Sequence, residues 1–112
     1  MRTGIMLIVA ALSMPAAAAD GSIEKGRRLF ETVGCYQCHG YVGQGGSAGL
    51  RLAPDPLPLE ALVQFVRETK GAMPSYSADV LSDADLGAIY AFLKSVPQSR
   101  KVDEISLLRS LR

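Results

Sequence analysis

The chain has 112 residues, a formal net charge of +1 and no tryptophan, so it has room for one small domain with a modest apolar core. Its 12 lysine and arginine residues barely outnumber its 11 acidic residues, which excludes the basic excess typical of nucleic-acid binding. Its only two cysteines and its only histidine lie together in the segment Cys35-Tyr-Gln-Cys38-His39.

Residues 1–19 have the pattern of a secretory signal peptide. Arg2 gives a positive start, residues 4–12 are apolar, and small residues at 17–19 precede Asp20. The apolar run is shorter than the roughly 20 residues that a membrane span needs. The pattern predicts export to the periplasm with cleavage before Asp20, and a retained N-terminal anchor is the alternative. Thiols are seldom left free in such an oxidising compartment.

Three helices are predicted in the rest of the chain. Apolar side chains recur at helical spacing over residues 20–32 and again over residues 59–70. The third helix follows a pattern that resembles a capping box, with Ser82 first and Asp85 last, and it ends before Pro97. Because no stretch alternates as a strand does, the chain is predicted to be all-α.

The helical domain is expected to span residues 20–97. A glycine inside a helix is costly, so Gly26 indicates the close approach of a second helix. Residues 41–58 are rich in glycine and proline and should form an irregular loop. Residues 98–112 form an extension whose apolar residues at 102, 105 and 108 permit a short amphipathic helix. The extension either lies on its own domain or docks to a partner.

Three kinds of site compete for the cysteine and histidine segment. A structural zinc ion needs about four ligands, but Cys35, Cys38 and His39 supply three. A dithiol oxidoreductase sets its cysteines beside a βαβ sheet, for which no strands are predicted. Covalent haem attachment uses every residue, because each thiol bonds one vinyl group and His39 then lies beneath the iron. We therefore predict one c-type haem, bound through Cys35 and Cys38 with His39 as an axial ligand.

Met73 is predicted to be the second axial ligand. It is the only one of the four methionines outside the signal pattern, and the chain has no second histidine. Met73 lies in a loop between helices, where Pro74 favours an extended backbone. Imidazole and thioether together raise the reduction potential and fill both axial positions, which suits electron transfer. Core packing is the alternative role for Met73, and Lys70 is a weaker candidate ligand because its amine must first lose a proton.

In their order along the chain, these features resemble the class I c-type cytochromes, which carry one haem with His/Met ligation. The resemblance covers about residues 22–97. It implies a small cytochrome c fold, about three main helices and loops around the haem, whose first and last helices cross near Gly26, Phe30 and Tyr90. It also implies that a loop proline, matched here by Pro54, accepts a hydrogen bond from the ring of His39 through its carbonyl. The resemblance rests on Gly26 with Phe30, Cys35 to Gly40, Leu52-Ala-Pro54, Gly71-Ala-Met73-Pro74, and Leu81 to Leu93.

Other residues are weaker candidates near the haem. Pro56 is the alternative to Pro54, and Arg51 is a candidate partner for a haem propionate. Tyr41 and Tyr76 are candidates for contact with the porphyrin edge, with ordinary packing as the alternative. The glycine-rich run at 43–49 lacks the lysine of a phosphate loop, so we expect it to pack tightly past the haem edge.

The functional prediction is a periplasmic electron carrier that is not an enzyme. Its expected partners are redox proteins, a donor dehydrogenase and an acceptor oxidase or cytochrome, with no nucleic acid and no transmembrane segment in the mature chain. One alternative is a haem subunit fixed within a dehydrogenase complex and docked through residues 98–112. A gas-binding haem sensor is a further alternative, which requires a sixth ligand that leaves the iron easily.

Overall fold

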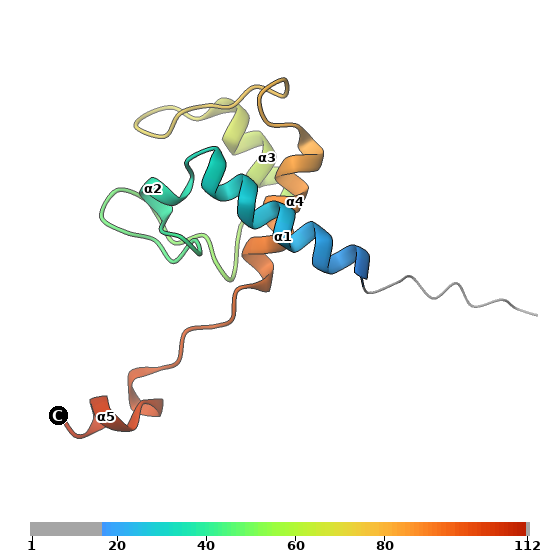
Figure 1. Cartoon of the computed structure of the whole chain (residues 1–112). Coiled ribbons are helices and arrows are strands. Elements are labelled where there is room, and N and C mark those ends of the chain that lie inside the picture. The colour runs from blue at the N-terminus through green and yellow to red at the C-terminus, as the bar shows by residue number, and fades with distance from the viewer. Residues whose placement is uncertain (1–16, 112) are drawn as a thin grey trace, which may run out of the picture.

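The computed structural model describes residues 17–111, and within that range the chain consists of helices and loops without a strand (Figure 1). The all-α prediction is therefore confirmed. Most of the expected signal sequence, residues 1–16, lies outside the described residues. The helical elements are α1 (Ala17–Thr32), α2 (Tyr36–His39), α3 (Leu59–Glu68), α4 (Asp83–Ser95), the 3-10 turn η1 (Val102–Glu104) and α5 (Ser106–Arg109).

Helix α1 begins three residues earlier than the sequence pattern suggests and ends at the expected residue, Thr32. The early start has a simple cause, because residues 17–19 are alanines and alanine has the highest helix propensity. Gly34 then adopts a positive φ of 86°, a conformation that glycine reaches without steric cost. This turn leads the chain directly from α1 into the cysteine and histidine segment.

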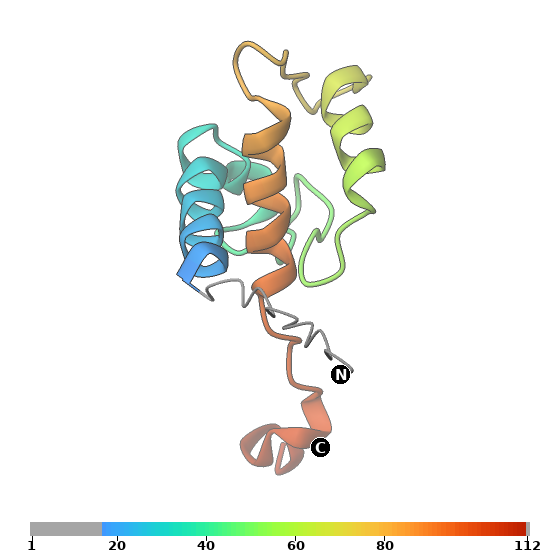
Figure 2. The same cartoon turned by 90° about the vertical axis from the view of Figure 1, so that its right-hand side faces the viewer.

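Helix α4 lies between α1 and α3 and forms the centre of the domain (Figure 2). It packs closely against α1, where a Cβ atom on Gly26 would collide with the carbonyl oxygen of Ala88. Beside this contact, the rings of Phe30 and Phe92 meet with centroids 5.7 Å apart and planes tilted by 57°. The close approach predicted from Gly26 is confirmed, and Tyr90 packs half-buried beside the crossing.

The end of α3 is set by the backbone conformation of Thr69, and the start of α4 by local hydrogen bonds. Helix α3 ends at Glu68, two residues before the predicted end, because Thr69 adopts an extended backbone. At the start of α4, Ser82 Oγ accepts a hydrogen bond from the backbone N–H of Asp85 at 3.1 Å. The Asp85 carboxylate accepts from the Ser82 hydroxyl at 2.8 Å and pairs with Lys25 of α1 at 2.7 Å. The predicted capping box is thus half formed, and its acidic residue links α4 to α1.

The C-terminal extension leaves the domain after α4 and projects away from it (Figures 1 and 2). Instead of one amphipathic helix it forms η1 and α5, separated at Ile105, whose backbone is extended. Gln98 donates a hydrogen bond to Asp55 at 3.0 Å, close to the point where the extension begins. Val102, Leu107 and Leu111 are all at least half exposed. In the described part of the chain, no helix is long and apolar enough to cross a membrane.

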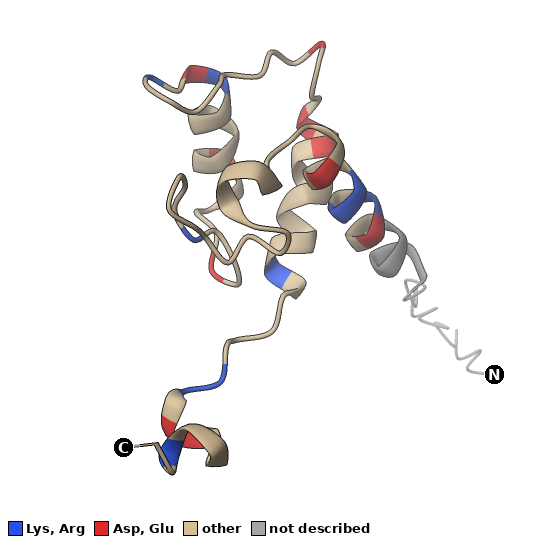
Figure 3. Ribbon diagram, turned by 60° about the vertical axis from the view of Figure 1, so that its left-hand side comes forward, with Lys and Arg blue, Asp and Glu red and all other residues tan. Residues whose placement is uncertain are grey.

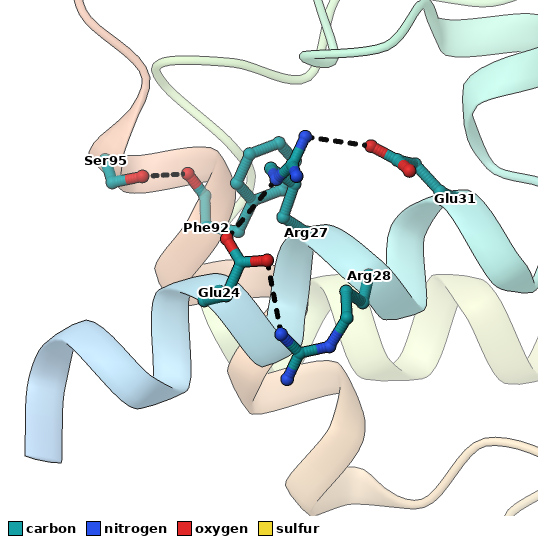
Figure 4. Close-up of polar contacts among 6 residues, drawn as sticks. All are labelled: Glu24, Arg27, Arg28, Glu31, Phe92 and Ser95. Atoms are coloured by element: carbon teal, nitrogen blue, oxygen red, sulfur yellow. Dashed lines mark hydrogen bonds and ion pairs between the residues drawn. The ribbon is translucent and has the colours of Figure 1, made fainter.

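Charged residues occur along α1, around the start of α4, at the end of α3 and in the C-terminal extension (Figure 3). On α1, Glu24 pairs with both Arg27 and Arg28, and Arg27 also pairs with Glu31 (Figure 4). These exposed pairs join neighbouring turns of one helix and contribute little to stability. Among the described residues no polar or charged side chain is fully buried, so the interior is apolar.

Candidate functional site

The cysteine and histidine segment forms a single helical turn, α2. The backbone N–H of His39 donates to the carbonyl of Cys35 at 3.0 Å, which brings these two residues to the same side of the turn. Cys35 is half-buried, Cys38 is exposed, and both are free thiols. The turn therefore presents two thiols and one imidazole from adjacent positions, as covalent haem attachment requires.

A cavity of about 300 Å³, here called the core cavity, lies between this turn and the helical core. Its wall includes Cys35, His39, Met73 and Tyr76. The remainder is largely apolar and comes from α1, α3, α4 and the two loops: Phe30, Leu50, Leu52, Pro56, Leu57, Leu62, Phe65, Val66, Leu81, Leu86, Ile89 and Leu93, with Arg51 and Asp55 as the charged members. Its size and apolar wall are typical of a site for a small ligand or cofactor.

A second cavity of about 350 Å³, the motif cavity, adjoins the first and includes Cys38 in its wall. The two cavities share six lining residues, namely Cys35, His39, Leu50, Phe65, Met73 and Tyr76. Together they bring both cysteines, the histidine and the methionine to the edge of one continuous apolar space. The four residues predicted to hold the cofactor are thus gathered by the fold.

The orientation of His39 is set by the backbone of the loop that follows it. His39 Nδ1 lies 2.7 Å from the carbonyl oxygen of Leu50. A carbonyl oxygen only accepts hydrogen bonds, so Nδ1 carries the hydrogen and donates it. The other ring nitrogen, Nε2, then keeps its lone pair and is the nitrogen suited to bind a metal.

This contact corrects the role assigned to Pro54. The carbonyl that orients His39 belongs to Leu50, and Pro54 lines neither cavity. The physical reason lies in the loop, where Gly45 has a φ of 86° and donates its N–H to the carbonyl of His39 at 2.8 Å. That bend brings residues 49–50 against the histidine before the chain reaches the proline. Pro56, the alternative, lines the core cavity.

Gly49 allows this close approach. A Cβ atom there would lie 2.9 Å from His39 Nδ1 and 2.8 Å from the Cys38 carbonyl oxygen, closer than carbon atoms normally approach. The glycine-rich run therefore packs tightly against the turn that carries both residues. Glycine at this position has no side chain to displace the imidazole from Leu50.

The Cys35 thiol is half-buried and lacks the lowered pKa of a thiol-redox site. Burial raises the pKa of Cys35 to about 11, against an ordinary value of 9.0, so the thiol stays protonated at neutral pH. Dithiol oxidoreductases instead lower the pKa of the attacking cysteine. This electrostatic environment argues against the thiol-redox interpretation.

Met73 lies in the loop between α3 and α4, and it is half-buried on the wall of both cavities. Thr69 donates its hydroxyl hydrogen to the Met73 carbonyl at 2.5 Å, which fixes the backbone at Met73 itself. Lys70, the weaker candidate ligand, is exposed and lines neither cavity. Of the two, the structure therefore brings only the methionine to the site.

The other residues predicted to lie near the haem differ in whether they line the two cavities. Tyr76 lines both cavities and donates its hydroxyl hydrogen to the Val33 carbonyl at 2.8 Å, and burial is the main cause that raises the pKa of this phenol. Tyr41 is 64% exposed and stacks on Tyr36 with ring centroids 4.8 Å apart, away from both cavities. Arg51 is exposed on the wall of the core cavity. Leu50 and Phe65 were not predicted from the sequence. Leu50 acts through its backbone carbonyl and Phe65 through an apolar side chain, and neither feature forms a recognisable sequence motif.

The donor set fits a c-type haem better than a bare metal ion. Over residues 17–111, no three side chains of histidine, cysteine, aspartate or glutamate come together as a metal site. Two thiols on one helical turn, an imidazole with Nε2 available, and a thioether instead surround an apolar space. A covalently bound haem needs thiols for attachment, neutral axial ligands and an apolar lining, and this site offers all three.

Comparison with known proteins points to one family. The family model described as cytochrome c oxidase, cbb3-type, subunit III matches residues 21–93. Two proteins named cbb3-type cytochrome c oxidase subunit CcoP, from Helicobacter pylori and from its strain 52, are 34% and 33% identical over 82 residues. The aligned region is 66% of this chain but 28% of each relative, so the chain spans little more than a quarter of their length. No solved structure matches.

Proposed function

The chain belongs to the cytochrome c family described as cbb3-type cytochrome c oxidase subunit III, and we propose that it transfers single electrons through one covalently bound haem c. In this proposal Cys35 and Cys38 form thioethers with the haem, while His39 and Met73 are the axial ligands. The observation that carries it is that His39 and Met73 line the same apolar cavity, with the His39 ring held by Leu50 so that Nε2 is available.

A bound haem supplies an iron that changes by one electron. The protein residues keep the geometry fixed during that change. The Leu50 carbonyl holds the imidazole plane, and Thr69 fixes the backbone of Met73. The largely apolar wall would favour the reduced state, as would a thioether ligand. His39 and Met73 would fill both axial positions of a bound haem and leave no coordination site for a substrate, so the proposed role is transfer and not catalysis.

We infer that the partner is a terminal oxidase. The two similar proteins are named as subunits of a cbb3-type oxidase, which favours an oxidase over a dehydrogenase as the complex concerned. The signal-like pattern at residues 1–19 supports a periplasmic site of action. The projecting extension, residues 98–112, is proposed to dock this domain onto that partner, since it exposes apolar side chains and leaves the domain surface.

The test begins with the pigment of the protein produced in a host that attaches c-type haem. We expect the colour to remain with the polypeptide after acid denaturation and extraction with organic solvent, because thioether bonds are covalent. Release of the pigment into the solvent, or a colourless protein, would refute covalent attachment. Cys35→Ser with Cys38→Ser should abolish retention.

Axial ligation is tested with Met73→Ala and with Lys70→Ala as the matched control from the same loop. Met73→Ala should lose the near-infrared band of sulfur-to-iron charge transfer, lower the reduction potential and bind carbon monoxide promptly in the reduced state. Lys70→Ala should change none of these. Prompt carbon monoxide binding by the unaltered protein would favour the gas sensor instead.

A further inference from the structure

Arg67, near the end of α3, is the one arginine among the described residues that joins separate elements through hydrogen bonds on both arms of its guanidinium. Its Nη1 donates to the carbonyl of Tyr76 at 2.9 Å. Its Nη2 pairs with Asp83, the first residue of α4, at 2.5 Å. The side chain of Arg67 is only 19% exposed, so its contact with the Tyr76 carbonyl is partly shielded from water, whereas Asp83 is 73% exposed and pairs with Arg67 at the surface.

The Met73 loop depends on a few such contacts, because residues 70–82 contain no helix or strand. Thr69 holds the loop at the Met73 carbonyl, and Arg67 holds it three residues later at the Tyr76 carbonyl. The Tyr76 N–H donates to the Val66 carbonyl of α3 at 3.0 Å, and its hydroxyl reaches Val33 at the end of α1. Tyr76 is therefore the point at which this loop is fastened to the helices, three residues beyond the methionine.

We propose that Arg67 is a positioning residue, which holds Met73 over the cavity by fixing the backbone at Tyr76, with Asp83 orienting the guanidinium. This inference rests on the proposed ligation by Met73. A guanidinium is planar and presents several donors in a fixed fork, so it binds a carbonyl and a carboxylate at once. Lysine, a single point charge on a flexible stem, holds at most one of these two partners well.

Arg28 offers a direct contrast on the same molecule. It pairs with Glu24 one turn away on α1, and the two side chains are 63% and 50% exposed (Figure 4). An exposed pair within one helix contributes little and positions nothing beyond that helix. Arg28→Leu therefore removes one arginine and one ion pair without touching the Met73 loop, which makes it the matched control for Arg67→Leu.

The first measurement is the affinity of the reduced, haem-loaded protein for carbon monoxide, which competes with Met73 for the sixth position. Ligand affinity scales with the fraction of molecules in which Met73 has moved away. Arg67→Leu should raise the affinity roughly tenfold or more, the scale expected when a charged hydrogen bond is lost. Arg67→Lys and Asp83→Asn should each raise the carbon monoxide affinity by less than Arg67→Leu does. Arg28→Leu should leave the affinity unchanged.

The second measurement is amide hydrogen exchange at Tyr76, which requires no ligand-binding activity. In Arg67→Leu the Tyr76 N–H should lose protection, while the Leu86 N–H, bonded to Ser82 within α4, keeps its protection. Equal loss at both amides would show general destabilisation and overturn a positioning role.

The outcomes separate the two proposals. If Met73→Ala keeps the sulfur-to-iron band, the ligand assignment fails and the role of Arg67 fails with it. If Met73→Ala loses that band while Arg67→Leu leaves both carbon monoxide affinity and Tyr76 protection unchanged, only the role of Arg67 is overturned. If Arg67→Lys left the carbon monoxide affinity unchanged, a positive charge alone would suffice and the role of the planar fork of donors would be overturned.

Discussion

Gly26 of α1 lies directly against the backbone carbonyl of Ala88 in α4, with no space between them for a Cβ atom. The contact sets how closely the two longest helices approach. Phe30, one turn further along α1, is fully buried and lines the core cavity. Because α1 continues into the turn that carries the cysteines and His39, the position of that turn depends on this helix crossing.

Gly26→Ala should therefore destabilise the protein by about 1–3 kcal/mol, the usual cost of forcing an extra group into a packed contact. Gly87→Ala is the matched control in the partner helix, because a Cβ atom at Gly87 meets nothing within 4 Å. That change should be neutral or stabilising by up to about 1 kcal/mol, since alanine is the better helix former. Denaturant unfolding of both variants measures the difference, and equal stability of the two would contradict the packing argument.

Gly49→Ala should disturb the site with a smaller effect on the fold. The added Cβ atom would press on the His39 ring and weaken its hydrogen bond to Leu50. Metal-binding histidines depend on such a partner, and its loss typically costs about 10–100-fold in metal affinity or activity. We expect the reduction potential of Gly49→Ala to shift. We also expect His39 to leave the iron at a lower pH and a lower temperature than in the unaltered protein. Optical spectroscopy measures both changes.

Gly46→Ala is the control for that experiment, because a Cβ atom at Gly46 would come no closer than 3.4 Å to the Cys38 carbonyl oxygen. Its spectrum and potential should match those of the unaltered protein. The interpretation of Gly49 would be wrong if the two variants had the same potential.

The sequence was most informative where a residue type has a single physical explanation. A glycine inside a helix indicated a close helix contact, and the contact is present at Gly26. The periodic segments predicted α3 and α4 to within two residues at each end. Met73 and the cysteine and histidine segment, both singled out from the sequence, proved to line adjoining cavities.

The sequence misled or was silent where a contact is made by a backbone carbonyl and not by a side chain. Every residue has a carbonyl, so no pattern identified Leu50 as the partner of His39, and the choice of Pro54 rested on resemblance alone. Arg67 was missed for a related reason, because its two partners, Tyr76 and Asp83, lie nine and sixteen residues away. Such contacts become visible only when the loop between α3 and α4 is placed in space.

Removing residues 98–112 should leave the haem domain intact. The extension lies outside the apolar core, and Gln98 joins it to the domain through a hydrogen bond to Asp55. The truncated protein should keep the spectrum, the reduction potential and, within about 0.5 kcal/mol, the stability of the full chain. It should lose affinity for the oxidase, as measured by co-purification.

A double variant tests whether the exposed leucines of the extension make the docking contact. Leu107 and Leu111 are 71% and 76% exposed, so Leu107→Ser with Leu111→Ser should weaken co-purification without altering the domain. Full association of the truncated protein with the oxidase would rule out a docking role for this segment.

The pairing of Asp85 with Lys25 makes one contribution to stability dependent on pH. The hydrogen bond from Lys25, followed by that from Ser82, lowers the pKa of the Asp85 carboxyl from its ordinary value of 3.8. A carboxyl with a depressed pKa in the folded state stabilises the fold above its ordinary pKa. That contribution is lost as the pH falls from 3.8 through the lower, folded-state value.

Lys25→Met should therefore raise the pKa of Asp85 toward its ordinary value, which carboxyl chemical shifts in an acid titration report directly. At pH 6 the variant should be less stable than the unaltered protein, and the difference should shrink below pH 3.8, where the carboxyl becomes protonated in both. Lys94→Met, which removes an exposed lysine from the other end of α4, should leave the Asp85 titration unchanged. A stability difference that stays constant from pH 6 to pH 2 would show that Lys25 acts through packing of its stem and not through the charge on Asp85.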